Sequence, residues 1–145
     1  MQIRIGNKQD EVAVRAFVAT QTERLGLGLP DFSGEFADLK NIVSNYIGHD
    51  GIFLIAEEEN KVVGFAAARS KSDTACIVER IFVDREWIER GLLKQLVDKI
   101  IDFARGLDYH QLEVHCQAPY VESLLESLQF TRSSDAHRLL FLRSL

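Results

Sequence analysis

This sequence of 145 residues has few cysteines and no long apolar run. Cys76 and Cys116 are too few for a disulfide framework or a structural zinc site, and they fit a reducing cytosol. No apolar run approaches the ~20 residues that span a membrane. The first residues also lack the basic segment and long apolar stretch of a signal peptide. We therefore expect a cytoplasmic protein that is not inserted in a membrane.

The sequence also lacks linkers, repeats and low-complexity tracts, and it has only two prolines. Apolar residues make up 46% and charged residues 27%, which is the balance of a globular protein. A single domain over residues 1–145 follows. The net charge of −5 argues against nucleic acid as a partner, because polyanion binders are usually basic. It favours a cationic substrate such as an amine.

Hydrophobic periodicity predicts alternating strands and helices along the chain. Strands are expected at residues 2–6, 52–56, 62–68, 75–83, 111–116 and 139–142. Helices are expected after the capping residues 7–10, at 34–46, from 92 to Gly106 and at 121–128. In the second helix, Phe36, Leu39, Ile42 and Val43 are expected to face inward. The order β-α-α-β-β-β-α-β-α-β predicts an α/β (α+β) fold, a mixed central sheet with helices on both faces.

The segment 79–96 carries a more specific signal. It reads Glu-Arg-Ile-Phe-Val, then Arg90-Gly91, then a leucine-rich run. This resembles the GNAT superfamily of acyl-CoA-dependent N-acetyltransferases, in which Glu-x-Leu-Tyr-Val precedes a glycine-rich loop, Arg-Gly-x-Gly-x-Gly/Ala, and a leucine-rich helix. Val63-Gly64-Phe65 matches the family's Val-Gly-Phe strand, and residues 118–130 resemble its late helix. The resemblance extends over residues 1–145.

The resemblance implies acetyl-CoA as a co-substrate, and a helix N-terminus is suited to its pyrophosphate because unpaired N–H groups and the helix dipole attract anions. The implied contacts are Ile81, Phe82, Val83, Glu89, Arg90, Gly91, Leu92 and Leu93. A backbone N–H near Phe82 or Val83 would hold the acetyl carbonyl. Within the loop only Gly91 keeps the family residue. Ile88, Glu89 and Leu93 replace the usual Arg or Gln, Gly, and Gly or Ala.

The resemblance also implies a carboxylate base on the central strand, which corresponds to Glu79. Burial would raise its pKa and suit it to that work; alternatively, it forms a salt bridge with a neighbour. Arg80 is a poor partner, because adjacent strand residues point to opposite faces. Leu125 stands where the family has its tyrosine acid. Tyr120, earlier in the same helix, is the remaining candidate acid or a packing residue.

Other residues allow two interpretations each. Cys116 is a candidate proton donor or nucleophile, or simply buried, and His115 next to it alternates toward the surface. The connection 25–32, which lies on the expected substrate side, is a lid or a plain loop. Acidic residues there would attract a cation: Asp31, Glu35 and Asp38. The four histidines show no metal-ligand spacing, so no metal is expected.

These observations predict transfer of an acetyl group from acetyl-CoA to a primary amine, on a small molecule or peptide, by direct attack in a ternary complex. The alternative is a GNAT-like binding or regulatory domain without catalysis, with a pocket filled by Leu93 and Leu125. An opening between the strands that end near Val83 and Cys116 would count against that alternative. A third interpretation is transfer of a longer acyl group past Leu125. The apolar strand 139–142 is compatible with a homodimer interface.

Overall fold

The computed structural model describes residues 1–115, 119–132 and 140–145; of Pro119, Tyr120 and Leu140 it describes the backbone alone. Seven strands are present in the described ranges: β1 (Gln2–Ile5), β2 (Ile52–Glu58), β3 (Lys61–Ser70), β4 (Ala75–Val83), β5 (Gln111–His115), β6 (Thr131–Arg132) and β7 (Leu140–Ser144). The α-helices are α1 (Glu11–Arg24), α2 (Ile42–Asn45), α3 (Arg85–Ile88), α4 (Leu92–Gly106) and α5 (Pro119–Ser127). Short 3-10 helices are η1 (Lys8–Asp10), η2 (Ala37–Lys40) and η3 (Ile47–His49).

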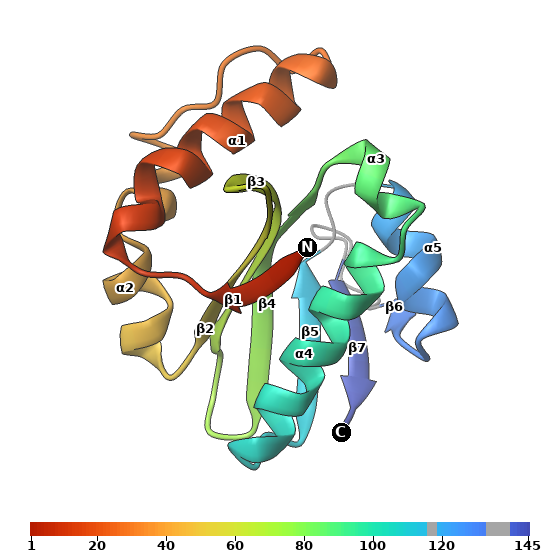
Figure 1. Ribbon diagram of the computed structural model, residues 1–145. Coiled ribbons are helices and arrows are strands. Elements are labelled where there is room, and N and C mark those ends of the chain that lie inside the picture. Colours follow the sequence, from red (N-terminus) through yellow and green to blue (C-terminus); the bar gives the residue numbers. More distant parts are fainter. Residues whose placement is uncertain (116–118, 133–139) are drawn as a thin grey trace.

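The strands form one sheet in the order β1-β2-β3-β4-β5-β7-β6. Every neighbouring pair is antiparallel except β4 and β5, which run parallel and are connected through α3 and α4. Helices α1 and α2 lie on one side of the sheet, and α4 and α5 lie on the other (Figure 1). The predicted mixed sheet with helices on both faces is confirmed. None of the helices in the described ranges is long and apolar enough to cross a membrane.

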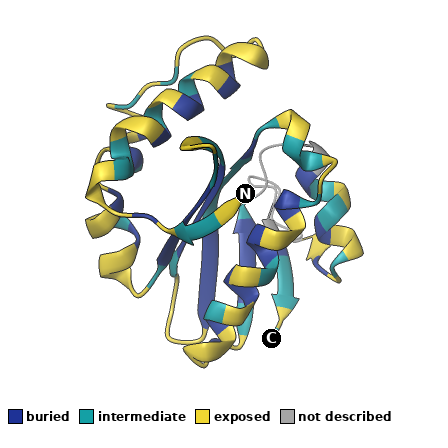
Figure 2. Ribbon diagram, in the orientation of Figure 1, coloured by how far each residue is buried: buried dark blue, intermediate teal, exposed yellow. Residues whose placement is uncertain are grey.

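One hydrophobic core lies between the sheet and α4. The apolar residues of α4 repeat at helical spacing and are buried against β2, β3, β4 and β5, as predicted. Leu125 of α5 and Phe130, which follows α5, join the same core. The buried sheet therefore runs between two layers of helices whose outer faces are exposed (Figure 2).

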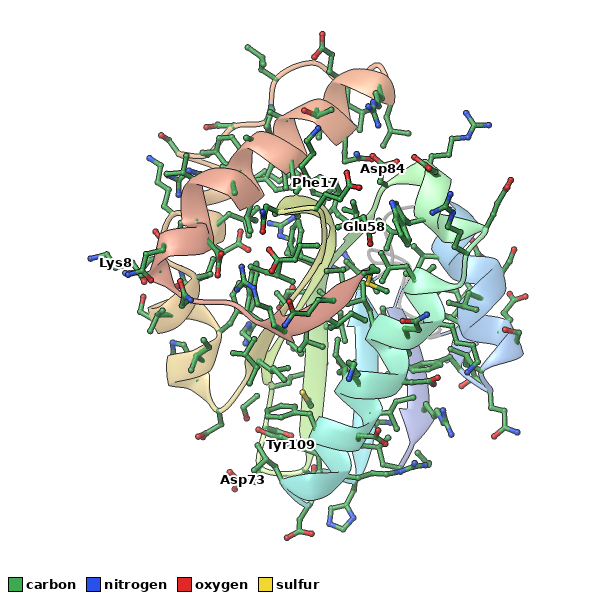
Figure 3. All side chains as sticks on the ribbon, viewed as in Figure 1. Lys8, Phe17, Glu58, Asp73, Asp84 and Tyr109 are labelled. Atoms are coloured by element: carbon green, nitrogen blue, oxygen red, sulfur yellow. The ribbon has the colours of Figure 1, made fainter. Side chains whose placement is uncertain are left out.

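The second core, on the α1 and α2 side, is built around an aromatic stack. Phe65 of β3 is fully buried and stacks on Phe53 and Phe82 with ring centroids 5.3 and 5.4 Å apart. Phe17 points from α1 toward the sheet and contacts Phe65 edge-on at 6.2 Å (Figure 3). Phe82 belongs to β4, so this core supports the strand that carries the candidate site.

The segment expected as one helix over 34–46 is broken into η2 and α2, and η3 follows directly after it. Asn41 interrupts it, because its backbone leaves the helical region (φ −147°, ψ 82°) and its side chain caps α2 by accepting from the N–H of Ser44. Phe36, Leu39 and Ile42 are buried as predicted, but Val43 is 40% exposed, so its inward assignment was wrong. The short elements α3 and β6 had no counterpart in the prediction.

We expect Asp10→Asn to lower the free energy of unfolding by about 1 kcal/mol at pH 7. Arg4 donates two hydrogen bonds to the Asp10 carboxylate, at 2.8 and 2.9 Å, and these hold its pKa below the usual range. Because the pKa of Asp10 is lower in the folded protein, the carboxylate stabilises the fold at pH values above its pKa in the unfolded chain, which is near 4. This contribution is lost as the pH falls through the folded-state pKa. Urea denaturation of both proteins between pH 7 and pH 3 measures this. A difference that does not shrink at low pH would contradict the assignment.

Candidate functional site

Strands β4 and β5 separate part-way along β4. Their parallel pairing runs from Ala75 opposite Gln111 to Val78 opposite Val114, while β4 continues to Val83. On its other edge β4 stays paired with β3, and the N–H of Asp84 donates to the carbonyl oxygen of Val63 at 2.8 Å. Successive backbone N–H groups along a strand point to opposite edges. Since the N–H of Asp84 faces β3, the N–H groups of Ile81 and Val83 point away from β3, toward the edge where β5 is no longer paired.

A β-bulge lies where the separation begins. Ala67 is opposite Arg80 and Ala68 is opposite Val78, so Glu79 is an extra residue in β4. A bulge interrupts the alternation of side chains. Glu79 and Arg80 consequently line the same pocket, although strand alternation predicted opposite faces for them. The expectation that Arg80 is not the partner of Glu79 is confirmed, because Arg80 pairs with Asp38.

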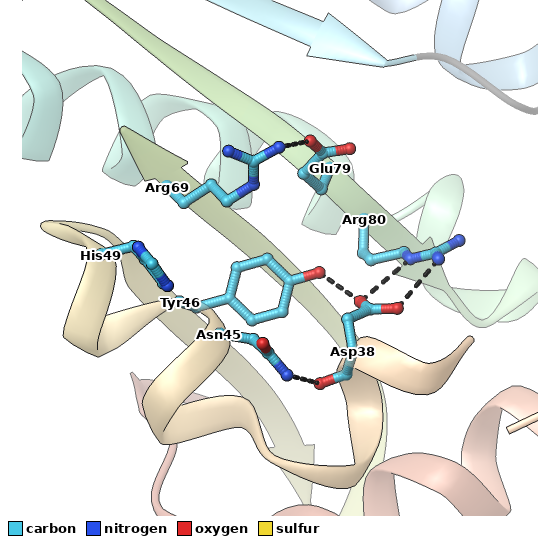
Figure 4. Close-up of a pocket in the computed structure, with 7 residues that line it drawn as sticks. All are labelled: Asp38, Asn45, Tyr46, His49, Arg69, Glu79 and Arg80. Atoms are coloured by element: carbon cyan, nitrogen blue, oxygen red, sulfur yellow. Dashed lines mark hydrogen bonds and ion pairs between the residues drawn. The ribbon is translucent and has the colours of Figure 1, made fainter. Parts of the chain in front are cut away.

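That polar pocket, of about 330 Å³, lies beside η2, α2 and η3 (Figure 4). It is lined by Asp38, Asn45, Tyr46, His49, Arg69, Glu79 and Arg80. An Arg69 guanidinium nitrogen lies 2.5 Å from Glu79 Oε1, and Arg80 donates to both carboxylate oxygens of Asp38 at 3.0 and 3.2 Å. The Tyr46 hydroxyl also donates to Asp38, and burial raises the pKa of Tyr46 well above its usual range. Each arginine here is therefore neutralised by a carboxylate.

His115 is the residue that sequence reasoning missed. The alternation along β5 predicted a surface position, but the imidazole is 24% exposed and its Nδ1 lies 3.8 Å from Glu79 Oε2. It lines the neighbouring cavity together with Ile81, at the point where β4 and β5 separate. Its only signal in the sequence is its place at the end of a strand. The salt bridge that the sequence offered as an alternative role for Glu79 is formed with Arg69. His115 lies nearest to the other carboxylate oxygen of Glu79.

The neighbouring cavity, here called the leucine cavity, has a volume of about 630 Å³. Its described lining is Thr22, Leu25, Leu27, Leu29, Pro30, Asp31, Glu35, Phe36, Ile81, Phe82, His115 and Val121. The loop after α1 therefore faces β4 and β5 across this cavity, and the acidic residues Asp31 and Glu35 are among its lining. Asp38 instead belongs to the polar pocket.

A third cavity, of about 750 Å³, adjoins it beside the start of α3 and α4 and is called the α4 cavity. Its described lining is Gln21, Arg24, Leu25, Val83, Arg85, Ile88 and Glu89. Arg24 contacts Asp84 at 2.9 Å and connects the end of α1 to this region.

Gly91 precedes α4 with φ 81°, and a side chain added there would meet open space. The first helical bond runs from the N–H of Gln95 to Gly91 O, so the N–H groups of Leu92, Leu93 and Lys94 have no partner within the helix. Near this N-terminus, Arg90 lies over the Trp87 ring at 4.7 Å and contacts Glu86 at 3.3 Å.

The comparisons with known proteins agree with this geometry. The model of the acetyltransferase (GNAT) family matches residues 20–125, a span that contains β2 to β5, helix α4 and the last residues of α1. The chain belongs to the GNAT family. The predicted family resemblance is thereby confirmed.

Among individual GNAT proteins, the human N-acetyltransferase 8 is 33% identical over 81 residues, which cover 52% of this chain and only 36% of that protein. A crystal structure of a GNAT acetyltransferase from Staphylococcus aureus Mu50 is similar with a TM-score of 0.87, 17% identity and coverage of 99% and 98% of the two chains. Phosphinothricin acetyltransferase from Sinorhizobium meliloti, solved with AcCoA, has a TM-score of 0.75 at 16% identity, covering 99% and 88%.

The residues that depart from the GNAT sequence pattern lie in two kinds of surroundings, the core and a cavity wall. Leu93 is 3% exposed and packs in the core beneath α4, and Leu125 is fully buried there too. Neither side chain is among the described lining of the three cavities. Glu89, in contrast, does line the α4 cavity.

Several predicted site residues lie outside what the structure describes. Cys116 and Ala118 fall in the undescribed segment, and the side chain of Tyr120 is not described although its backbone belongs to α5. No group of three His, Cys, Asp or Glu side chains within the described ranges is arranged to hold a metal ion.

Proposed function

We propose that residues 1–145 act as one catalytic domain that transfers an acetyl group from acetyl-CoA to a primary amine within a ternary complex. The observation that carries this proposal is the separation of β4 from β5, with two N–H groups of β4 facing the opening and the free N-terminus of α4 beside it. Membership of the GNAT family supports acyl transfer. The acetyl-CoA complex of the related phosphinothricin acetyltransferase supports the choice of donor.

The pyrophosphate of acetyl-CoA would bind at the N-terminus of α4. The N–H groups of Leu92, Leu93 and Lys94 have no helical partner, and the open space at Gly91 allows an anion to approach the backbone. Arg85 lines the α4 cavity and has no ion pair among the described residues, so it is free to offset the charge of Glu89.

The thioester carbonyl would accept a hydrogen bond from the backbone of β4. Of the two positions expected from the family resemblance, Val83 fits, because its N–H points toward the opening, whereas the N–H of Phe82 points toward β3. A fixed N–H donor stabilises the negative charge that develops on the carbonyl oxygen during attack.

Glu79 and His115 together would act as the base. His115 faces the leucine cavity and takes one proton from the substrate ammonium, and the Glu79 carboxylate stabilises the resulting imidazolium. The nitrogen lone pair then forms a C–N bond as the C–S bond breaks, with the electron pair leaving on sulfur. The second proton of the nitrogen passes to that sulfur, directly or through Tyr120, so CoA leaves as a thiol. The first proton passes from His115 to water.

We expect Gly91→Asp to weaken acetyl-CoA binding at least tenfold more than Gly91→Asn. Aspartate and asparagine have the same shape and both tolerate a positive φ, so the pair isolates one negative charge beside the phosphate site. Isothermal titration calorimetry of the native protein and both variants measures the dissociation constants.

A native dissociation constant in the micromolar range, about −8 kcal/mol, would support the donor site. Equal affinities for both variants would contradict the placement of the pyrophosphate. Absence of binding at millimolar acetyl-CoA would overturn the proposed function and favour a non-catalytic binding domain. The physical reason for such a result would be repulsion between the Glu89 carboxylate, which lines the α4 cavity, and the phosphates.

A further inference from the structure

The leucine cavity is bounded on one side by exposed apolar side chains. Leu25, Leu27 and Leu29 are 59%, 72% and 87% exposed, and they alternate with Gly26 and Gly28 along the loop after α1. Large apolar side chains gathered at one cavity in this way usually mark a binding surface. Phe36 and Phe82 continue the apolar surface on the sheet side, where they lie in tilted contact at 6.2 Å.

The charges of the cavity have one sign. Asp31 and Glu35 are exposed residues of its lining, and none of the described lining residues is a lysine or an arginine. Carboxylates at an apolar cavity attract a cation and disfavour an anion. The only other ionisable group of the described lining is His115, next to Glu79.

Among its described lining residues, the adjacent polar pocket offers no unpaired arginine or lysine to a substrate carboxylate. Arg69 is paired with Glu79, and Arg80 is paired with Asp38 and donates to the carbonyl of Glu35. Arg80 also lies over the Phe36 ring at 4.5 Å. An amino-acid acceptor would have to break one of these ion pairs, whereas an amine without a carboxylate would not.

We propose that the acetyl acceptor is a small primary amine with an apolar alkyl or aryl body. The body lies between the three leucines and the Phe36–Phe82 surface, and the ammonium is directed toward His115 and Glu79. This inference rests on the proposed function and specifies the acceptor that the same site takes.

The test compares acceptors in the full chain with saturating acetyl-CoA, following release of the CoA thiol. We expect kcat/KM for n-hexylamine and 2-phenylethylamine to exceed that for ethanolamine, spermidine, L-glutamate and a tetrapeptide by tenfold or more. Higher values for glutamate, spermidine or the peptide would overturn the inference, yet they would leave the proposed acetyl transfer intact. Calorimetry with acetyl-CoA alone reports separately on the donor site.

Variants of the loop after α1 test whether its leucines contact the acceptor or the acyl donor. Leu27→Ser with Leu29→Ser should raise KM for 2-phenylethylamine about tenfold or more relative to KM for ethanolamine, and leave the affinity for acetyl-CoA unchanged. Both leucines are exposed, so the melting temperature should not change. Leu107→Ser is the matched control, because Leu107 is 51% exposed after α4 and does not line the cavity.

Two results of the loop variants would overturn the inference. An unchanged KM for 2-phenylethylamine would show that the leucines do not contact the acceptor. A loss of acetyl-CoA affinity, or a loss confined to hexanoyl-CoA, would show that they cover the acyl donor. Asp31→Asn with Glu35→Gln should raise KM for the amines and reduce its dependence on salt. An unchanged KM would overturn the assignment of a cationic acceptor to this cavity.

Discussion

His115→Ala is expected to lower kcat/KM for amine acetylation by about 10²–10⁴, the usual contribution of a positioned base. Glu79→Gln should cause a loss within the same range, because the Glu79 carboxylate lies 3.8 Å from His115 Nδ1 and belongs to the same proposed base. Two groups that act as a unit are not additive. The double variant should therefore be scarcely slower than the slower single variant, as measured by initial rates with acetyl-CoA and an amine.

Three controls separate this role from a structural one. His110→Ala changes an exposed histidine at the opposite end of β5 and should leave the rate unchanged. Arg69→Gln removes the ion pair with Glu79, so a loss as large as that of Glu79→Gln would assign Glu79 to the ion pair instead of the base. Added imidazole should restore part of the activity of His115→Ala. Full activity of His115→Ala would refute the proposed base.

Phe65→Ala is expected to lower the free energy of unfolding by about 3–5 kcal/mol, the usual effect of truncating a buried phenylalanine. Phe65 is fully buried and contacts three other phenylalanine rings, so the truncation removes apolar burial and aromatic contacts and leaves a cavity. Urea denaturation measures the change. Phe65→Leu refills much of the space and should cost less than half as much.

Phe65→Ala should also lower the rate of acetyl transfer, because Phe82 stacks on Phe65 and lines the leucine cavity. Val43→Ala is the control for stability, since Val43 is 40% exposed and its loss should cost less than about 0.5 kcal/mol. A loss of less than 1 kcal/mol for Phe65→Ala would mean that the aromatic stack is not the centre of this core.

The main elements of the fold were predictable because they depend on local patterns. The helical spacing of apolar residues in α4 and the apolar runs of β2 and β3 indicate directly which residues are buried. The segment 79–96 was sufficient for the family, and the capping residues before α1 were recognised from Asn7 and Asp10. These signals need no knowledge of distant residues.

The break at Asn41 shows the limit of such patterns. Apolar spacing continues through residues 36–43 and indicates one helix, yet Leu39 lies in η2 and Ile42 in α2, two short helices of different geometry. Both residues are buried in the core with Phe53 and Phe65 of the sheet, and those contacts are not visible in the local sequence.

The sequence alone determined the family and the mixed sheet, and it singled out Glu79 as the candidate base. The tertiary structure decided what surrounds Glu79. A bulge of one residue brings Arg80 to its side, and the end of the β4–β5 pairing brings His115, 36 positions later in the chain, to within 3.8 Å. The physical reason is that side-chain direction in a strand reverses with each residue of register. Register is set by pairing between distant strands, so the partners of Glu79 could be known only after the sheet had formed.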